Sequence, residues 1–203
     1  RGIVPDYAAG LSLGEYSALQ CAGVFTAPQA ISLAAFRGKA MAAAAAGRPC
    51  GMTAVLGLDR EKLQEACRQA AALAKELGAK RCLPLKVSGP FHTSLLAPAG
   101  DALREKFKET AFGAMRIPVL FNCLGREMGP EDTIPALLEK QVQTSVYMED
   151  TIRRLAELGV DTIVEIGPGK ALIGFVKKTA PAIKTYAVET CADLDALSAA
   201  LKG

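Results

Sequence analysis

The stretch Ala9–Ala18 reads "AGLSLGEYSA" and sets one serine, Ser12, inside an apolar run, with a glycine two residues away on either side. Burial is a poor reason for a serine in such a run. The pattern Gly-x-Ser-x-Gly is typical of a nucleophile elbow, in which a strand turns sharply into a helix and the neighbours of the serine must be nearly bare of side chain. The motif therefore predicts a strand-to-helix turn with a nucleophilic Ser12 at its apex.

Outward from this elbow, strand-like and helical segments alternate along the chain. Strands are expected at 7–11, 51–58, 80–89, 117–125, 161–166 and 184–190. Helices are expected at 14–22, 27–47, 59–78, after His92 up to 110, at 134–142 and 149–158, and after the last two strands. Thr26 is placed to cap the second helix, with Pro28 in its first turn. This alternation predicts an α/β fold with a mainly parallel sheet and flanking helices.

The composition limits the class of protein. The chain has 203 residues, 50% hydrophobic and 22% charged, which suits one large globular domain with or without a small appendage. No apolar run approaches the length of a membrane span, and the first ten residues lack the apolar core of a secretory signal. The net charge of +3 comes without a basic stripe bearing aromatic residues, which argues against a nucleic-acid partner.

Six cysteines are scattered along the chain without a Cys-x-x-Cys pair, and the chain has one histidine. This spacing argues against both a zinc site and a disulfide framework. We therefore expect reduced thiols, a cytoplasmic protein and no bound metal.

The single histidine, His92, lies in "VSGPFHTSLL", just past an expected strand and at the start of a helix. A lone histidine in a loop can be purely structural. A serine, however, needs a base of near-neutral pKa to become a nucleophile, and imidazole is the usual choice. If any serine of this chain is activated by imidazole, the base must be His92.

Arg37 lies on the apolar helical segment "AISLAAFRGKAMAA". On an ordinary amphipathic helix its guanidinium would extend to solvent. Its flanks are so apolar that a buried role, gripping an anion through two parallel hydrogen bonds, is an equal alternative.

The segment "EIGPGK" at 165–170 has some likeness to a phosphate-binding loop. It lacks the Gly-x-x-x-x-Gly-Lys-Ser/Thr spacing of a nucleoside-triphosphate site. A tight turn from a strand into a helix is the better interpretation.

Together these segments resemble the malonyl-CoA:acyl carrier protein transacylases, the acyltransferases of fatty-acid synthesis. The matching pieces occur in that family's order: "AAGLSLGEYSAL", "RGKAM", "GMTAVLGL", "AKRCLPLKVSGPFHTSLLAPAG" and "GVDTIVEIGPGKALIGF". The resemblance implies a hydrolase-like α/β acyltransferase core at 1–50 and 90–203. It also implies a small ferredoxin-like α+β subdomain at 51–89.

The resemblance also implies the roles of the site residues. Ser12 would be the nucleophile, His92 its base, and Arg37 the clamp for the malonyl carboxylate. One further expectation is a backbone N–H from Leu13 in the oxyanion hole, and another is a backbone carbonyl near Tyr147 that orients the histidine. The implied reaction is a ping-pong transfer of malonyl from malonyl-CoA to the pantetheine thiol of acyl carrier protein, without a cofactor. We expect a cytoplasmic monomer that binds neither nucleic acid nor membrane.

Two departures from the family pattern affect these expectations. The family begins with a strand and a "GQGSQ"-like loop that donates the second oxyanion N–H, whereas this chain starts just short of the elbow strand. Losing one such donor typically lowers turnover on the order of 10²–10³-fold. The family's small subdomain also has a strand pair between its two helices, which the continuous run "EKLQEACRQAAALAKELGAK" lacks. We therefore expect an incomplete subdomain, with residues missing between Ala70 and Ala71.

Two alternatives remain open at this point. A serine esterase or thioesterase of the α/β-hydrolase type shares the elbow but places its histidine nearer the C-terminus. A degenerate acyltransferase that only docks a carrier protein would need no acyl-serine at all.

Overall fold

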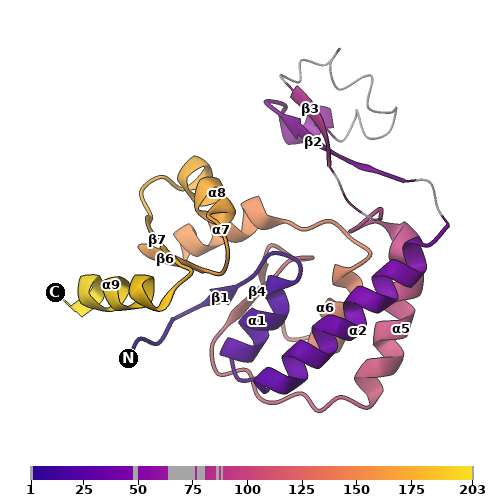
Figure 1. Ribbon diagram of the computed structural model, residues 1–203, viewed down its shortest axis with the longest axis horizontal. Helices are drawn as coiled ribbons and strands as arrows, with labels where there is room; N and C mark the ends of the chain where they lie inside the picture. Colours follow the sequence, from indigo (N-terminus) through magenta and orange to yellow (C-terminus); the bar gives the residue numbers. More distant parts are fainter. Residues whose placement is uncertain are drawn as a thin grey trace.

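The computed structural model describes residues 2–47, 50–63, 76, 81–85, 87 and 89–202. Its helices are α1 (Gly14–Cys21), α2 (Ala27–Ala45), α5 (Ala97–Lys108), α6 (Ile134–Gln141), α7 (Met148–Glu157), α8 (Ala171–Thr179) and α9 (Cys191–Lys202), with a 3-10 turn, η1 (Ser94–Leu96), before α5. Its strands are β1 (Ala8–Ala9), β2 (Met52–Leu56), β3 (Arg81–Leu85), β4 (Val119–Phe121), β5 (Arg126–Glu127), β6 (Thr162–Ile166) and β7 (Lys184–Val188). Helices and strands alternate along most of the described chain, as the sequence predicts (Figure 1).

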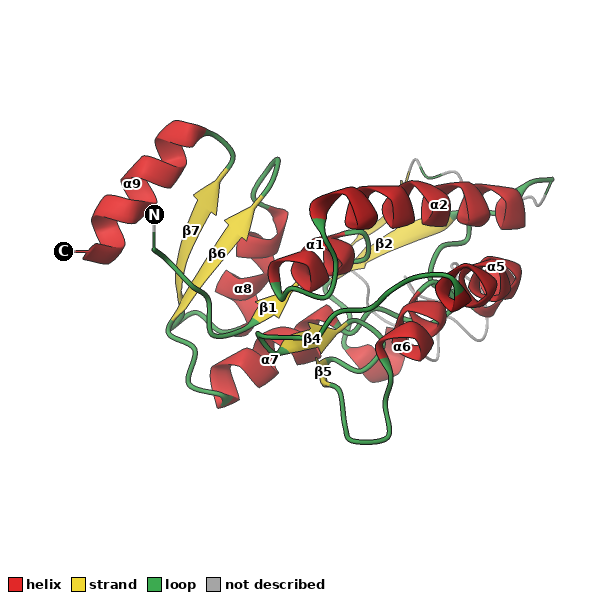
Figure 2. Ribbon diagram, turned by 90° about the horizontal axis from the view of Figure 1, so that it is seen from below, coloured by secondary structure: helices red, strands yellow, loops and turns green. Residues whose placement is uncertain are grey.

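The strands form three short sheets within the described residues, which corrects the expectation of one mainly parallel sheet. β1 pairs in parallel with β4, and β6 pairs in parallel with β7, side by side in Figure 2. β5 joins β4 in antiparallel fashion, because a turn as short as residues 122–125 can only reverse the chain. β2 and β3 are also antiparallel, with Met52 opposite Leu85.

The larger hydrophobic core joins helices α1, α2, α5 and α6 to strand β4. Each contributes a buried side chain, in that order Leu19, Leu33, Leu103, Leu138 and, from β4, Phe121. α2 and α5 lie side by side over this core (Figure 1). Since β1 and β4 end at the edge of this cluster, the residues that follow them stand on the most rigid part of the fold.

Helix α2 begins as the sequence predicts. Thr26 is its N-cap and forms a capping box with Gln29, and Pro28 lies in the first turn. The cap fixes the start of a 19-residue helix whose middle carries Arg37.

A smaller core packs Ile152 of α7 against Val176 of α8 and Ile183 before β7. The predicted turn between strand and helix at 165–170 is confirmed, because β6 ends at Ile166 and α8 begins at Ala171. Glu165 accepts hydrogen bonds from the backbone N–H groups of two residues in the first turn of α8, at 3.1 and 2.8 Å. The N-terminus of α8 therefore already binds a carboxylate of the chain itself, which favours a structural turn over a phosphate-binding loop at 165–170.

Strands β2 and β3 stand apart from the helices of the main core (Figure 1). Arg60, just after β2, ties this part to α7 through two hydrogen bonds of 3.1 Å to the Asp150 carboxylate. Most of the helix predicted at 59–78, including the join between Ala70 and Ala71, lies outside the described residues. The domain boundaries therefore stay a prediction.

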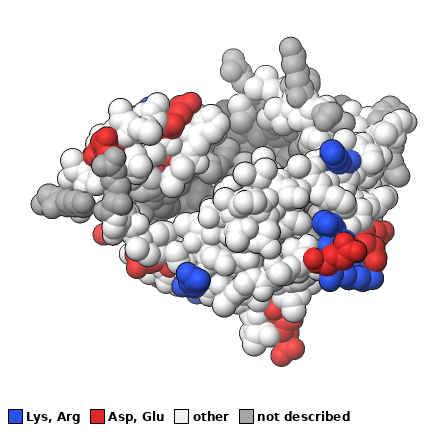
Figure 3. Space-filling model, turned by 60° about the horizontal axis from the view of Figure 1, so that its bottom comes forward, with Lys and Arg blue, Asp and Glu red and all other residues white. Residues whose placement is uncertain are grey.

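The described surface carries few charges on the face seen in Figure 3, where one group at the right of the view holds both acidic and basic side chains. Among the described residues, Arg104 of α5 contacts both Asp101 and Glu139. Exposed pairs of this kind add little to stability. In the part of the chain described, no helix is both long and apolar enough to cross a membrane.

Candidate active site

The segment between β1 and α1 forms the predicted elbow. Ser12 has a φ of 52°, in the left-handed region that residues with a side chain seldom adopt. A Cβ on Gly10 would lie 2.0 Å from the backbone carbon of Gly14, so only glycine allows the strand and helix to pass so closely. A Cβ on Gly14 would meet nothing within 4 Å, so crowding accounts for the first glycine of the motif and not for the second.

Ser12 and His92 come together although they lie 80 residues apart in sequence. Ser12 Oγ is 2.8 Å from His92 Nε2, and His92 Nδ1 is 2.9 Å from the backbone carbonyl oxygen of Gln141. A carbonyl can only accept a hydrogen bond, so the Nδ1 proton points at Gln141 and Nε2 is free to accept the serine proton. Burial lowers the pKa of His92 below its usual value, which favours this neutral form.

The expectation that a carbonyl at Tyr147 orients the histidine is corrected here. His92 is oriented by Gln141, the last residue of α6. Tyr147 is the N-cap of α7, and its carbonyl accepts the backbone N–H and the hydroxyl of Thr151 in that helix. Its carbonyl is thus used within its own helix.

Arg37 reaches the same point from the middle of α2 and is only 5% exposed. Its Nη2 donates to Ser12 Oγ at 2.7 Å, and its Nε and Nη2 donate to Gln141 Oε1 at 3.2 and 3.1 Å. Its guanidinium also lies over the ring of Tyr16, 5.9 Å from the centroid. Among the described residues no carboxylate forms an ion pair with it. The side chain of Arg37 is therefore buried and does not extend to solvent.

Asn122 holds both sides of the elbow from the end of β4. Its Oδ1 accepts the Ser12 N–H at 2.6 Å, and its Nδ2 donates to the Gly10 carbonyl at 2.6 Å. The Asn122 N–H in turn donates to Glu15 Oε2 of α1 at 2.7 Å. Burial raises the pKa of Glu15 to about 7. These contacts brace a strained backbone that would otherwise relax.

Gln141 links the three predicted residues. Its side-chain Nε2 donates to the Ser12 carbonyl at 2.8 Å, its Oε1 accepts from Arg37, and its backbone carbonyl orients His92. The sequence analysis missed Gln141, Asn122 and Glu15. The available signal was a polar residue directly after an apolar strand, in "VLFN", and a glutamate inside the apolar start of α1.

Leu13 follows Ser12 as the N-cap of α1, and the residue is 54% exposed. Within the described part of the chain its backbone N–H makes no hydrogen bond. A free donor next to the nucleophile is what an oxyanion hole requires.

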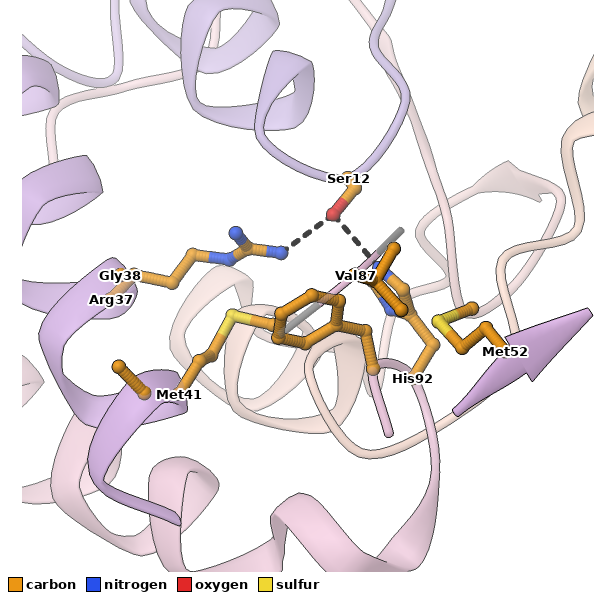
Figure 4. A pocket seen from close by; sticks show the side chains of 9 residues that line it. Ser12, Arg37, Gly38, Met41, Met52, Val87 and His92 are labelled. Atoms are coloured by element: carbon orange, nitrogen blue, oxygen red, sulfur yellow. Dashed lines mark hydrogen bonds between the residues drawn. The ribbon is translucent and has the colours of Figure 1, made fainter. Parts of the chain in front are cut away.

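A pocket of about 450 Å³ opens in front of Ser12. It is mostly apolar, and helix α2 and the region of β2 and β3 both contribute to it (Figure 4). Its lining residues are Ser12, Arg37, Gly38, Met41, Ala42, Met52, Val87, Phe91 and His92. The site can therefore hold an apolar chain that presents one negative charge to Arg37 and one electrophilic carbon to Ser12.

The chain was also compared with known proteins, which identifies its relatives independently of the geometry of the site. No model of a protein family matches the chain. Two curated relatives, the malonyl CoA-acyl carrier protein transacylases of Bacillus subtilis and Escherichia coli K12, are 36% and 33% identical to it. The matches cover 92% and 99% of this chain and 68% and 74% of the relatives.

Solved structures agree in fold. The malonyl CoA-acyl carrier protein transacylase of Clostridium perfringens has a TM-score of 0.93 at 33% identity, over 99% of this chain and 72% of that one. A malonyl-transacylase solved in complex with a type II PKS acyl-carrier protein has a TM-score of 0.88 at 34% identity, over 98% of this chain and 74% of that one. The fold is that of the α/β acyltransferases. The chain belongs to the malonyl CoA-acyl carrier protein transacylase family.

Proposed function

We propose that the protein transfers a malonyl group from malonyl-CoA to the pantetheine thiol of an acyl carrier protein, through a malonyl ester on Ser12. The observation that carries this proposal is the 2.8 Å contact between Ser12 Oγ and the chain's single imidazole. Family membership supplies the two substrates. No cofactor is needed, because the acyl group arrives already activated as a thioester.

The first half-reaction loads the serine. His92 Nε2 takes the proton of Ser12 as Oγ attacks the thioester carbonyl, and the Leu13 N–H stabilises the oxyanion. The C–S bond then breaks, and the departing CoA sulfur receives the proton from His92. In the second half-reaction His92 deprotonates the pantetheine thiol, the sulfur attacks the ester, and Ser12 leaves with its proton restored.

Arg37 selects the acyl group. Burial disfavours the charged form of Arg37, which forms no ion pair with a carboxylate of the described residues, and the free carboxylate of malonyl would supply a direct partner. An acetyl group would leave the charge unmatched, so acetyl-CoA should load poorly. In the free protein Ser12 Oγ occupies one of the donors that the carboxylate would take.

We further propose that residues 1–50 and 90–203 form the acyltransferase core and that 51–89 form an incomplete ferredoxin-like subdomain over the pocket. Met52 and Val87 bring this second part to the pocket wall. The match to the Escherichia coli relative extends over 230 residues, longer than the 203 residues of this chain, so it contains gaps in this chain. This supports missing residues at the join between Ala70 and Ala71. We place the reaction in the cytoplasm, in keeping with free thiols at Cys21, Cys50, Cys123 and Cys191.

Intact-mass measurement tests the proposal. After mixing with malonyl-CoA we expect one malonyl adduct, which is absent in Ser12→Ala and retained in the control Ser17→Ala, an exposed serine on helix α1, which follows Ser12. Adding carrier protein with its pantetheine thiol should move the adduct to the carrier. An adduct lost equally fast to water would support the esterase alternative, and carrier binding without any adduct would support the docking alternative.

A further inference from the structure

Gly38 is a glycine that the fold itself does not require. It lies inside helix α2, where glycine is among the least favourable residues. Its φ is not positive, so no special backbone conformation calls for glycine. Apart from its two chain neighbours and the backbone of its own helix, a Cβ at this position would meet no atom within 4 Å, so packing against the rest of the fold does not call for glycine either.

The position of Gly38 supplies the missing reason. It lines the pocket next to Arg37 (Figure 4). Ala42, one turn further along α2, also lines the pocket. The open space at Gly38 therefore belongs to the substrate pocket and lies at the root of the side chain that would hold the carboxylate.

The chemistry of loading shows why this space is needed. Arg37 Nη2 is now 2.7 Å from Ser12 Oγ. In a malonyl-serine the carboxylate carbon is three bonds away from Oγ, so the guanidinium cannot keep this contact and bind the carboxylate in the same place. Binding the carboxylate therefore calls for a different position of the guanidinium, and the space beside it on α2 is at Gly38.

We propose that Gly38 is a specificity-determining residue, whose missing side chain leaves room for the Arg37 guanidinium and the acyl carboxylate to settle together against α2. This rests on the proposed function and deepens it. A side chain at position 38 would fill that room, while the part of the pocket that receives an uncharged acyl group or CoA alone would stay open.

Binding measurements in a Ser12→Ala background test the proposal without any chemistry. Gly38→Ala should weaken malonyl-CoA binding by roughly 10-fold or more, the usual effect of one misplaced methyl group, and leave acetyl-CoA and CoA binding unchanged. Gly174→Ala is the matched control, because Gly174 also lies in a helix, α8, with nothing within 4 Å of its added Cβ, and it is outside the pocket. Equal losses for all three ligands, or no loss for malonyl-CoA, would overturn the proposal.

Thermal unfolding separates this role from a structural one. Both glycine-to-alanine variants should raise Tm by roughly 1–4 °C, because alanine favours the helix. A lower Tm for Gly38→Ala alone would mean that the fold needs this glycine, and the proposal would be wrong. If the binding pattern holds but wild-type protein forms no malonyl-serine, then the proposed transfer fails and the assignment of Gly38 stands.

Discussion

His92 and Gln141 are joined by a hydrogen bond of 2.9 Å from the imidazole Nδ1 to a backbone carbonyl. The group that orients the base is therefore part of the main chain, at the end of α6, and no substitution of a side chain can remove it directly. The side chain of Gln141 serves Arg37 and the elbow instead. The two functions of this residue can be separated by experiment.

Gln141→Ala should leave the orientation of His92 unchanged and weaken the positioning of Arg37. It removes the acceptor of the Arg37 Nε and Nη2 groups and leaves the carbonyl that holds His92. We expect the preference for malonyl-CoA over acetyl-CoA to fall roughly 10- to 100-fold in kcat/KM, with an unchanged pH profile. Lys140→Ala, on the exposed side of the same helix, is the control. A changed pH profile with unchanged preference would contradict the separation.

Malonyl loading should stay fast at mildly acidic pH. Burial lowers the pKa of His92, so its neutral form persists below the usual midpoint of about 6.5. Single-turnover rates of Ser12 acylation are expected to fall only below that pH as the imidazole gains its proton. His92→Ala should lose about 10²–10⁴-fold in rate across the range. A midpoint above 6.5 in the wild type would disagree with the buried, neutral imidazole.

Glu15 should make the protein less stable as pH rises. Its pKa is about 7 in the fold against about 4.5 in an unfolded chain. Below pH 4.5 the carboxyl is protonated in both states, between 4.5 and 7 only the unfolded chain loses its proton, and above 7 the loss of stability is complete. The free energy of unfolding of Glu15→Gln, taken relative to the wild type at the same pH, should therefore be higher at pH 8 than at pH 4 by on the order of 3 kcal/mol.

Chemical denaturation at several pH values measures this difference. Glu131→Gln, at an exposed glutamate in a loop, provides the comparison for the same substitution outside the core. If Glu15→Gln shifts stability equally at pH 4 and pH 8, the pKa of Glu15 does not change on folding, contrary to the raised pKa of the buried carboxyl.

The two glycines of the elbow should differ sharply. Gly10→Ala would force a Cβ to within 2.0 Å of the Gly14 backbone, and we expect a loss of about 1–3 kcal/mol or more in stability together with loss of acyl-serine formation. Gly14→Ala meets open space and should retain stability and loading. Melting curves and intact mass measure both effects, and similar behaviour of the two variants would show that the elbow is shaped differently.

The sequence predicted those parts of the site that carry distinctive chemistry. Ser12 stood out by its flanking glycines, His92 by being the single imidazole, and Arg37 by its apolar flanks. The sequence analysis missed Asn122 and Gln141 because the signal of a polar residue after an apolar strand is weak, and because Ser12 and Arg37, which they contact, lie more than 100 residues away in the chain. Only the folded chain brings such partners together.

The expectation of one mainly parallel sheet was wrong for a related reason. Alternation of apolar segments identifies strands such as β4 and β6, but it does not say which strands pair. Tyr147 was assigned its role from family resemblance, by position in the chain. The carbonyl that contacts His92 belongs to a different residue, at the end of the preceding helix.

The pocket position of Arg37 has a practical consequence at the bench. Its guanidinium forms no ion pair with a carboxylate of the described residues, so it is open to small anions able to diffuse into the pocket. Sulfate, phosphate or free malonate in a buffer should thus act as competitive inhibitors against malonyl-CoA, and weakly or not at all against acetyl-CoA. Assays in dilute zwitterionic buffer will report the highest apparent affinity.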